Sequence, residues 1–188
     1  MSTSQIRCFI ALDLKEESIK DKIEDIQREL KGSGADLKLV ERQNLHFTLR
    51  FLGEIPLQKV EKIKEQLEGV KAESFEVVLK GIGVFPSFSR INVIWIGVSE
   101  GGDKIKEIYD KVNDALIPLF PKERGEYVPH LTIARVKSSR NREKLIKVIE
   151  RLREFEIGKV RFSEFQFKKS TLTPKGPIYE NLRVYPLE

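Results

Sequence analysis

The sequence predicts an α+β fold in which antiparallel or mixed sheets carry helices on one face. Segments with apolar residues at helical spacing alternate along the chain with short apolar runs typical of strands. Several neighbouring strands are joined by links too short for a parallel crossover, which favours antiparallel pairing. With 188 residues, 40% of them hydrophobic and 34% charged, the chain has the length and composition of a globular protein with a sizeable core.

The first half of the chain begins with a predicted strand, "RCFIAL" (Arg7–Leu12). A helix follows, ended by Gly32 and Gly34, and its buried stripe is Ile19, Ile23, Ile26 and Leu30. Strands are expected over residues 36–40 and 45–53, and then a helix after Pro56 whose inward residues are Leu57, Val60, Ile63 and Leu67. The next two strands, over residues 75–85 and 91–98, are expected to be joined by a turn that contains Pro86.

The second half repeats this rhythm. Asp103 is expected to cap a helix whose apolar stripe is Ile105, Ile108, Val112 and Leu116. A strand over residues 127–136 follows, and then a basic helix that carries Leu145, Val148, Ile149 and Leu152. Two strands, over residues 160–168 and 178–185, complete the prediction.

The two histidines of the chain occur in the same pattern of histidine, apolar residue, threonine and apolar residue. They open "HFTLRF" at His46 and "HLTIAR" at His130, 84 residues apart, and each is predicted to begin a strand. Only five residues of the chain are threonine, so this pairing is a poor candidate for coincidence. The repeated order of elements predicts an internal duplication, with two lobes of similar construction that each contribute one motif.

In a strand, side chains two positions apart point to the same side of the sheet. His46 and Thr48 are therefore expected on one face, with Leu45, Phe47, Leu49 and Phe51 on the other. His130 and Thr132 share a face in the same way. If the lobes meet across a cleft, one imidazole can accept a proton while the other donates one, and the hydroxyls can hold phosphoryl oxygens. The set suits in-line attack on a phosphodiester.

Other chemistries find little support. Two histidines and one cysteine leave only scattered carboxylates for a metal site, so no metal and no cofactor are expected. The chain has no GxxxxGK[ST] loop, no GxGxxG after a strand and no GxSxG elbow. Cys8 is expected to be a small buried residue and Trp95 to belong to the core.

Charge and hydropathy indicate the surroundings of the protein. The formal net charge is +5, and residues 135–161 hold ten basic and four acidic side chains, which suits a phosphate-bearing partner or else a solvated helix face. No stretch is long and apolar enough for a membrane span, and the first residues lack the apolar segment of a signal peptide, so a cytoplasmic location is expected. Lysine and glutamate number 43 against 11 asparagines and glutamines, a bias typical of thermophilic sources.

These motifs resemble those of the 2H phosphoesterases, a family named for two H-x-[ST]-h motifs in which h is apolar. "HFTLRFLGE" and "HLTIAR" are similar to the signatures of the RNA 2',3'-cyclic phosphodiesterase branch, historically called 2'-5' RNA ligases. "RCFIALDL", "VFPSFSRINVIWIGV" and "KSTLTPKGPIYENL" are similar to it as well, so the resemblance covers essentially the whole chain. Ile133 stands where leucine is usual.

The resemblance implies one bilobal domain over residues 1–188, with two pseudo-symmetric lobes of mostly antiparallel sheet, helices on the outer faces and a central cleft. It implies metal-free opening of a terminal RNA 2',3'-cyclic phosphate, for instance on tRNA halves, to a 2'-phosphate. The reverse joining of RNA ends through a 2'-5' linkage is implied too. His46 would be the acid that protonates the departing 3' oxygen and His130 the base that activates water, while Thr48 and Thr132 would bind phosphate oxygens. A monomer is expected.

Arg135 matches an arginine that the family uses near the phosphate, but it lies five residues after His130. A regular strand would turn it to the opposite face. A bulge could re-aim it, its long side chain could curl over the strand end, or its role could be structural. Further residues that could line the cleft are Arg7, Lys168, Ser170 and Tyr179.

Two other functions remain open from the sequence. The same site could act on another cyclic nucleotide or on an oligonucleotide. Alternatively, the basic second half could make the protein a non-catalytic RNA-binding module, whose affinity would fall steeply with salt and survive alanine at both histidines.

Overall fold

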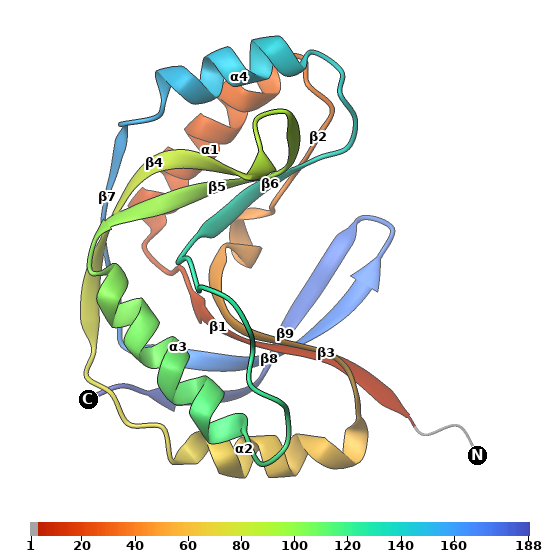
Figure 1. The fold of residues 1–188 in the computed structure, drawn as a ribbon, viewed down its shortest axis with the longest axis vertical. Helices are drawn as coiled ribbons and strands as arrows, with labels where there is room; N and C mark the ends of the chain where they lie inside the picture. Colours follow the sequence, from red (N-terminus) through yellow and green to blue (C-terminus); the bar gives the residue numbers. More distant parts are fainter. Residues whose placement is uncertain (1–3) are drawn as a thin grey trace.

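The computed structural model describes residues 4–188 and has the predicted α+β architecture (Figure 1). Within these residues, nine strands form one sheet in which every pair is antiparallel. The elements are β1 (Gln5–Asp13), α1 (Glu17–Gly32), β2 (Leu37–Leu39), η1 (Arg42–Asn44), β3 (His46–Pro56), η2 (Leu57–Lys59), α2 (Val60–Glu68), β4 (Phe75–Ser87), β5 (Arg90–Glu100), α3 (Gly102–Leu116), β6 (Leu131–Val136), α4 (Arg142–Arg151), β7 (Glu156–Phe162), β8 (Glu164–Thr173) and β9 (Gly176–Pro186).

The sheet is divided into two lobes by a narrow junction between β3 and β6. The strand order is β7-β4-β5-β6-β3-β1-β8-β9, with β2 paired to β6, and only Phe47 and Leu131 pair across the junction. We call β3, β1, β8 and β9 the first lobe and the remaining strands the second lobe. His46 begins β3 of the first lobe, and His130 directly precedes β6 of the second. The lobes are not the two halves of the chain, because β4 of the first half lies in the second lobe and β8 and β9 of the second half lie in the first.

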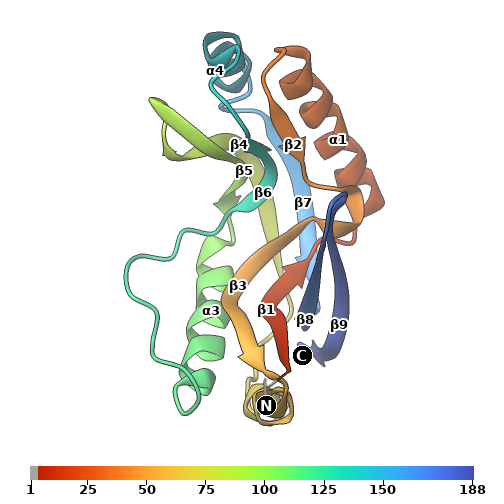
Figure 2. The same cartoon turned by 90° about the vertical axis from the view of Figure 1, so that its right-hand side faces the viewer.

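The helices cover the outer faces of the lobes (Figures 1 and 2). α1 and α4 pack on the second lobe, and α2 and α3 pack on the first. The predicted apolar stripes of α1 and α3 are fully buried. In α2 the buried stripe is Val60, Ile63 and Leu67, whereas Leu57 was wrongly expected inward: it lies in η2, before the helix proper, and is 53% exposed.

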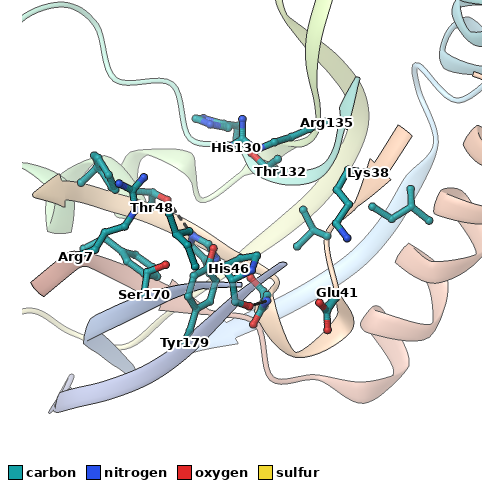
Figure 3. Close-up of a pocket in the computed structure, with 17 residues that line it drawn as sticks. Arg7, Lys38, Glu41, His46, Thr48, His130, Thr132, Arg135, Ser170 and Tyr179 are labelled. Atoms are coloured by element: carbon teal, nitrogen blue, oxygen red, sulfur yellow. Dashed lines mark hydrogen bonds between the residues drawn. The ribbon is translucent and has the colours of Figure 1, made fainter. Parts of the chain in front are cut away.

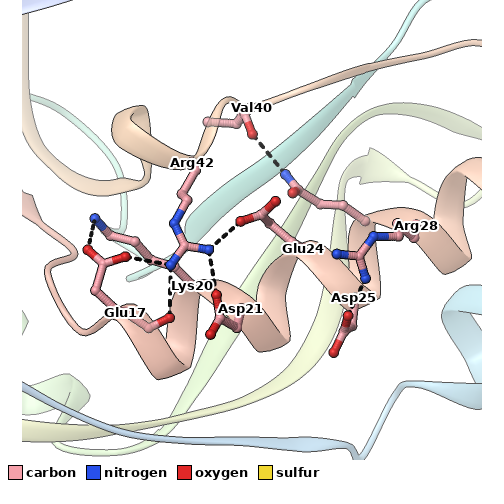
Figure 4. A network of polar contacts seen from close by, with 9 residues as sticks. Glu17, Lys20, Asp21, Glu24, Asp25, Arg28, Val40 and Arg42 are labelled. Carbon is pink, nitrogen blue, oxygen red and sulfur yellow. Dashed lines mark hydrogen bonds and ion pairs between the residues drawn. The ribbon is translucent and has the colours of Figure 1, made fainter.

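Polar contacts fix the segment that leads into the first motif. Arg42 of η1 forms ion pairs with Glu17, Asp21 and Glu24 on α1 (Figure 4). The pKa of Glu17 is lowered, chiefly by its hydrogen bond from Arg42. Gln27 of the same helix donates hydrogen bonds to two backbone carbonyls, of Val40 and Ile133, each at 2.9 Å. Helix α1 therefore ties the approach to His46 to strand β6 of the other lobe.

Two predicted boundaries are wrong where proline is involved. Pro86 lies inside β4 and not in the turn, which falls at residues 88–89. A proline is tolerated there because β7 pairs with β4 only over Phe75–Lys80, so that one edge of β4 is free at Pro86. The strand predicted from residue 127 begins at Leu131, because Pro129 has no N–H to donate to a ladder.

Two further predictions differ from the structure. The N-cap of α3 is Gly101, with a φ of 83°, and Asp103 lies in the first turn, where its charge still favours the helix dipole. A β-carbon at Gly101 would lie 2.4 Å from the carbonyl oxygen of Glu76, which explains the glycine.

The expected strand over residues 160–168 is divided at Ser163, because the chain passes there from β7 in the second lobe to β8 in the first.

Candidate active site

A cavity of about 510 Å³ lies between the two lobes and contains both histidine motifs. His46 and Thr48 line it from the first lobe, and His130 and Thr132 line it from the second, as Figure 3 shows. The other lining residues are Arg7, Phe9, Lys38, Leu39, Val40, Glu41, Asn44, Phe51, Arg135, Ser170, Leu172, Pro177 and Tyr179. The structure thus brings together the four motif residues that the sequence singled out.

His46 is held in a defined orientation on the first lobe. Its Nδ1 lies 2.7 Å from the carbonyl oxygen of Asn44, and its Nε2 lies 3.0 Å from Oγ1 of Thr48. A carbonyl only accepts hydrogen bonds, so Nδ1 carries a proton and Nε2 is the nitrogen that titrates. The rings of Phe9 and Tyr179 lie 5.1 and 5.5 Å from the imidazole. Burial lowers the pKa of His46, an effect that the hydrogen bond to Asn44 partly opposes.

His130 repeats this arrangement on the second lobe. Its Nδ1 lies 2.7 Å from the carbonyl oxygen of Val128, two residues earlier, so that Nε2 is again the free position. The rings of Phe85 and Trp95 lie 4.9 and 5.9 Å from its imidazole, at steep angles. Each histidine is therefore oriented by the carbonyl two residues before it and packed against two aromatic rings.

A β-bulge in β6 turns Arg135 into the cavity. In the pairing with β5, Ile94 lies opposite Ala134 and Trp95 opposite Thr132, so Ile133 has no partner. Ile133 and Ala134 are both buried, and the next residue, Arg135, returns to the face of Thr132. Of the three explanations left open by the sequence, the bulge is the one that the structure shows.

The equivalent place in β3 contains a second bulge, which the sequence did not predict. Opposite β1, Thr48 pairs with Ala11 and Arg50 with Ile10, which leaves Leu49 without a partner. Leu49 and Arg50 are both buried, and Phe51 faces the cavity at 49% exposure. The expectation that Phe51 lies on the face of Phe47 is wrong for this reason. Both motifs thus present the residue five positions after the histidine to the same cavity.

Three cations and one carboxylate line the cavity: Arg7, Lys38, Arg135 and Glu41. The guanidinium of Arg7 lies 4.7 Å from the centre of the Phe51 ring. Each bulge therefore has an arginine beside it, Arg7 on the first lobe and Arg135 on the second. Such a positive cavity suits an anionic ligand.

Among the four additional residues proposed from the sequence, Arg7, Ser170 and Tyr179 line the cavity and Lys168 does not. Lys168 is 7% exposed, and its Nζ donates hydrogen bonds at 2.7 Å to Asp13 and to Asn181. Asp13 pairs with His46 in the β1–β3 ladder and Lys168 pairs with Phe9 in the β1–β8 ladder, so Lys168 lies on the cavity face of the sheet, beside the lining residues.

The segment between α3 and His130 is attached to β3 by hydrogen bonds that no sequence motif predicts. Tyr127 donates a hydrogen bond of 2.9 Å to the carbonyl oxygen of Thr48, which links the segment just before the second motif to the first motif. Arg50 donates to the carbonyl oxygen of Pro121 and to Oδ1 of Asn113, each at 2.8 Å. The only hint in the sequence is an arginine at an otherwise apolar position of a strand.

Trp95 is partly exposed and packs between Gly83 and His130. It therefore belongs to the surroundings of the site, and the prediction that it lies in the core is wrong. A β-carbon at Gly83 would lie 2.3 Å from the indole ring. We expect Gly83→Ala to displace Trp95, to release His130 and to lower kcat. Because Trp95 is the single tryptophan of the chain, its fluorescence reports the displacement. Unchanged fluorescence and unchanged kcat would contradict this packing; Gly32→Ala, where nothing lies within 4 Å, is the control.

Cys8 lies in β1 and does not line the cavity. Cys8 is buried, as predicted, and burial raises the pKa of its thiol to about 11.

In residues 4–188 no group of three or more His, Cys, Asp or Glu side chains is placed to hold a metal ion. Over the same residues, none of the helices combines the length and the apolarity needed to cross a bilayer.

The fold and the paired motifs define a two-histidine phosphoesterase. The family model described as LigT like Phosphoesterase matches the chain twice, over residues 12–95 and 96–179, and each match contains one motif. The chain belongs to this family. The double match agrees with the internal duplication that the sequence predicts.

Relatives and solved structures extend this result. The RNA 2',3'-cyclic phosphodiesterase of Methanothermobacter thermautotrophicus is 39% identical over 97% of this chain and 100% of its own. The protein of the same name from Methanocaldococcus jannaschii is 41% identical over 95% and 99%. The thermophilic bias of the composition fits such sources. The crystal structure of TT0787 from Thermus thermophilus has a TM-score of 0.80 at 22% identity, covering 96% and 97% of the two chains. Apo LigT of E. coli has a TM-score of 0.79 at 22% identity, covering 99% of each chain, so both share the fold.

Proposed function

We propose that this protein is an RNA 2',3'-cyclic phosphodiesterase that opens a terminal cyclic phosphate to a 2'-phosphate without a metal ion. The observation that carries the proposal is the pair of imidazoles, each with Nδ1 bound to a carbonyl, that line one basic cavity. Curated relatives with this name, 39% and 41% identical, support the choice of substrate. Residues 1–188 act as one domain and the chain acts as a monomer, since one copy supplies the whole cavity.

In the reaction, a water oxygen attacks phosphorus and the bond from phosphorus to the 3' oxygen breaks. Nε2 of His130 accepts a proton from the water, and Nε2 of His46 gives a proton to the departing 3' oxygen. The 2' oxygen keeps the phosphoryl group. With the 5'-hydroxyl of a second RNA end in place of water, the same two proton transfers join the RNA ends through a 2'-5' linkage and again release the 3' hydroxyl.

The remaining residues of the site stabilise the charge on phosphorus-bound oxygens. Thr48 and Thr132 donate hydrogen bonds from the two sides of the cavity, and Arg135 supplies a positive charge beside Thr132. These groups are fixed by the sheet before substrate binds, which limits the reorganisation needed in the transition state.

The lowered pKa of His46 predicts a difference between two pH profiles. In the free protein, an acid with a lowered pKa loses its proton at a lower pH, so the alkaline limb of the kcat/KM profile lies at a lower pH than it would for an ordinary histidine. A bound phosphodiester anion favours the imidazolium and raises this pKa in the complex. We therefore expect the alkaline limb of kcat at higher pH than that of kcat/KM. Steady-state kinetics between pH 4 and pH 9 measure both, and coincident or inverted limbs would contradict the proposal.

A direct assay tests the function. The protein is incubated, with EDTA present, with a short RNA that ends in a 2',3'-cyclic phosphate, and the product is identified by its resistance to a 3'-specific phosphatase. We expect a 2'-phosphate and no loss of rate with EDTA. A 3'-phosphate product, or a folded protein that binds RNA without turnover, would refute the proposal; the second result would favour the RNA-binding module. Comparing a cyclic mononucleotide with RNA substrates separates the alternative small substrates.

A further inference from the structure

We propose that a second site, next to the catalytic cavity along β6, binds backbone phosphates of the RNA on the 5' side of its cyclic end. The inference rests on the proposed function and extends it from the reacting nucleotide to the polynucleotide chain. The site is formed by the tip of the β4–β5 hairpin, the end of β6 and the link from β6 to α4. It lies outside the two histidine motifs.

The proposed site is a separate hollow of about 220 Å³. Four of the side chains around it are basic, namely Arg90, Lys137, Arg140 and Arg142, and none is acidic. Ser89, Asn92, Ser138 and Ser139 add polar groups, and the remaining members are Ile91, Val136 and Leu145. A hollow with this composition suits a phosphodiester backbone, which presents negative charge at every step and uncharged polar groups between.

The charges of this hollow are free to act on a ligand. All four basic residues are exposed, and within residues 4–188 none of them forms an ion pair. Arg140 and Arg142 donate hydrogen bonds to the carbonyl oxygens of Gly34 and Ser89, at 3.1 and 2.6 Å. Those contacts orient the two guanidinium groups and leave their charge uncompensated. Arg42, by contrast, is paired with three carboxylates of α1.

Strand β6 connects the hollow to the catalytic cavity. The bulge at Ile133 returns Arg135 to the face of Thr132, and Lys137, which follows the last residue of β6, lines the hollow. Lys38 pairs with Arg135 across the β2–β6 ladder, so its side chain stands beside the arginine. Thr132, Arg135 and Lys137 thus form a line from the cavity to the hollow, and in Figure 1 β6 runs from the centre of the molecule toward α4.

The length of this line fits an RNA chain better than a mononucleotide. At the rise of a strand, Thr132 and Lys137 are about 15 Å apart, a distance that a few nucleotides span. A chain held at its cyclic end between the histidines can therefore place upstream phosphates first beside Lys38 and then in the hollow. Substrates that end before the hollow cannot use it.

The test compares two substrates and two variants with the same change of charge. Arg90→Gln with Lys137→Gln removes two charges of the hollow, and neither side chain has a hydrogen-bond or ion-pair partner in the described part of the chain. Lys62→Gln with Arg124→Gln is the control, since both residues are exposed, lack such partners and lie outside the two cavities. Each variant is assayed on a cyclic-phosphate dinucleotide and on a ten-nucleotide RNA with the same end.

For the hollow variant, we expect kcat/KM to fall by about 10-fold on the longer RNA and to stay unchanged on the dinucleotide. The salt dependence of binding to the longer RNA should weaken, with the slope of log K against log salt reduced by about 1.4. The control variant should match the wild type. Equal losses on both substrates, no loss on the longer RNA, or the same loss in the control would overturn the inference.

Failure of the proposed function gives a different result from failure of this inference. A wild-type protein that turns over neither substrate refutes the reaction. Fluorescence anisotropy with a labelled ten-nucleotide RNA ending in a 2'-phosphate then still measures the hollow, because binding needs no turnover. Equal affinity and equal salt slope for the wild type and the hollow variant in that measurement would refute the second site.

Discussion

Replacing His46 or His130 by alanine is expected to lower kcat by about 10²–10⁴-fold in each case, because each imidazole is assigned its own proton transfer. The two losses should not add in the double variant, since the reaction needs both transfers in one step. Single-turnover rates on a cyclic-phosphate RNA measure the chemical step without interference from product release.

Folding must be separated from chemistry in these variants. His46 packs against Phe9 and Tyr179, so its removal leaves a small gap, and His46→Gln is the variant that fills it. Circular dichroism and RNA affinity should stay near wild type in all of them. A variant that keeps more than about a tenth of the wild-type kcat would show that the histidine in question has no acid–base role.

Phe47→Ala is expected to reduce the free energy of unfolding by about 3–5 kcal/mol, the range for a buried phenylalanine. Phe47 has no exposed surface, packs edge-on against Phe162 at 5.8 Å, and with Leu131 forms the one pair that joins β3 to β6. Its removal leaves a cavity at the junction that keeps the two motifs facing each other.

Urea unfolding measures this loss, and Phe88→Ala is the matched control. Phe88 lies at the tip of the β4–β5 hairpin and is 49% exposed, so its replacement should change the free energy of unfolding by less than about 0.5 kcal/mol. A cost below about 1 kcal/mol for Phe47→Ala would contradict the importance of the junction.

Much of the fold could be predicted because helices and strands have strong periodicities. The stripes of α1 and α3 were predicted residue by residue, and the faces of His46 and Thr48 follow from strand alternation. The exchange of strands between lobes could not be predicted, since it depends on pairings between β1 and β8 and between β5 and β6 that no local pattern encodes.

At the site, the predictions that fail are those that depend on how strands pair, which no local pattern encodes. Alternation fails at a bulge, so the face predicted for Phe51 is wrong and the face of Arg135 does not follow from the sequence; the unpaired Leu49 and Ile133 account for both. The hydrogen bond from Tyr127 to the Thr48 carbonyl joins segments far apart in the chain, and a tyrosine in a polar stretch gives no sign of it. Motif residues were predictable because their chemistry is local, whereas the groups that position them were not.

In the proposed reaction, His46 protonates the departing 3' oxygen while His130 activates water. A cyclic substrate with sulfur in place of the 3' oxygen tests it most directly, because a thiolate leaves without needing a proton. We expect His46→Ala to regain most of the wild-type rate on the sulfur substrate and His130→Ala to stay inactive on it. Equal impairment of both variants, or rescue of His130→Ala alone, would contradict it.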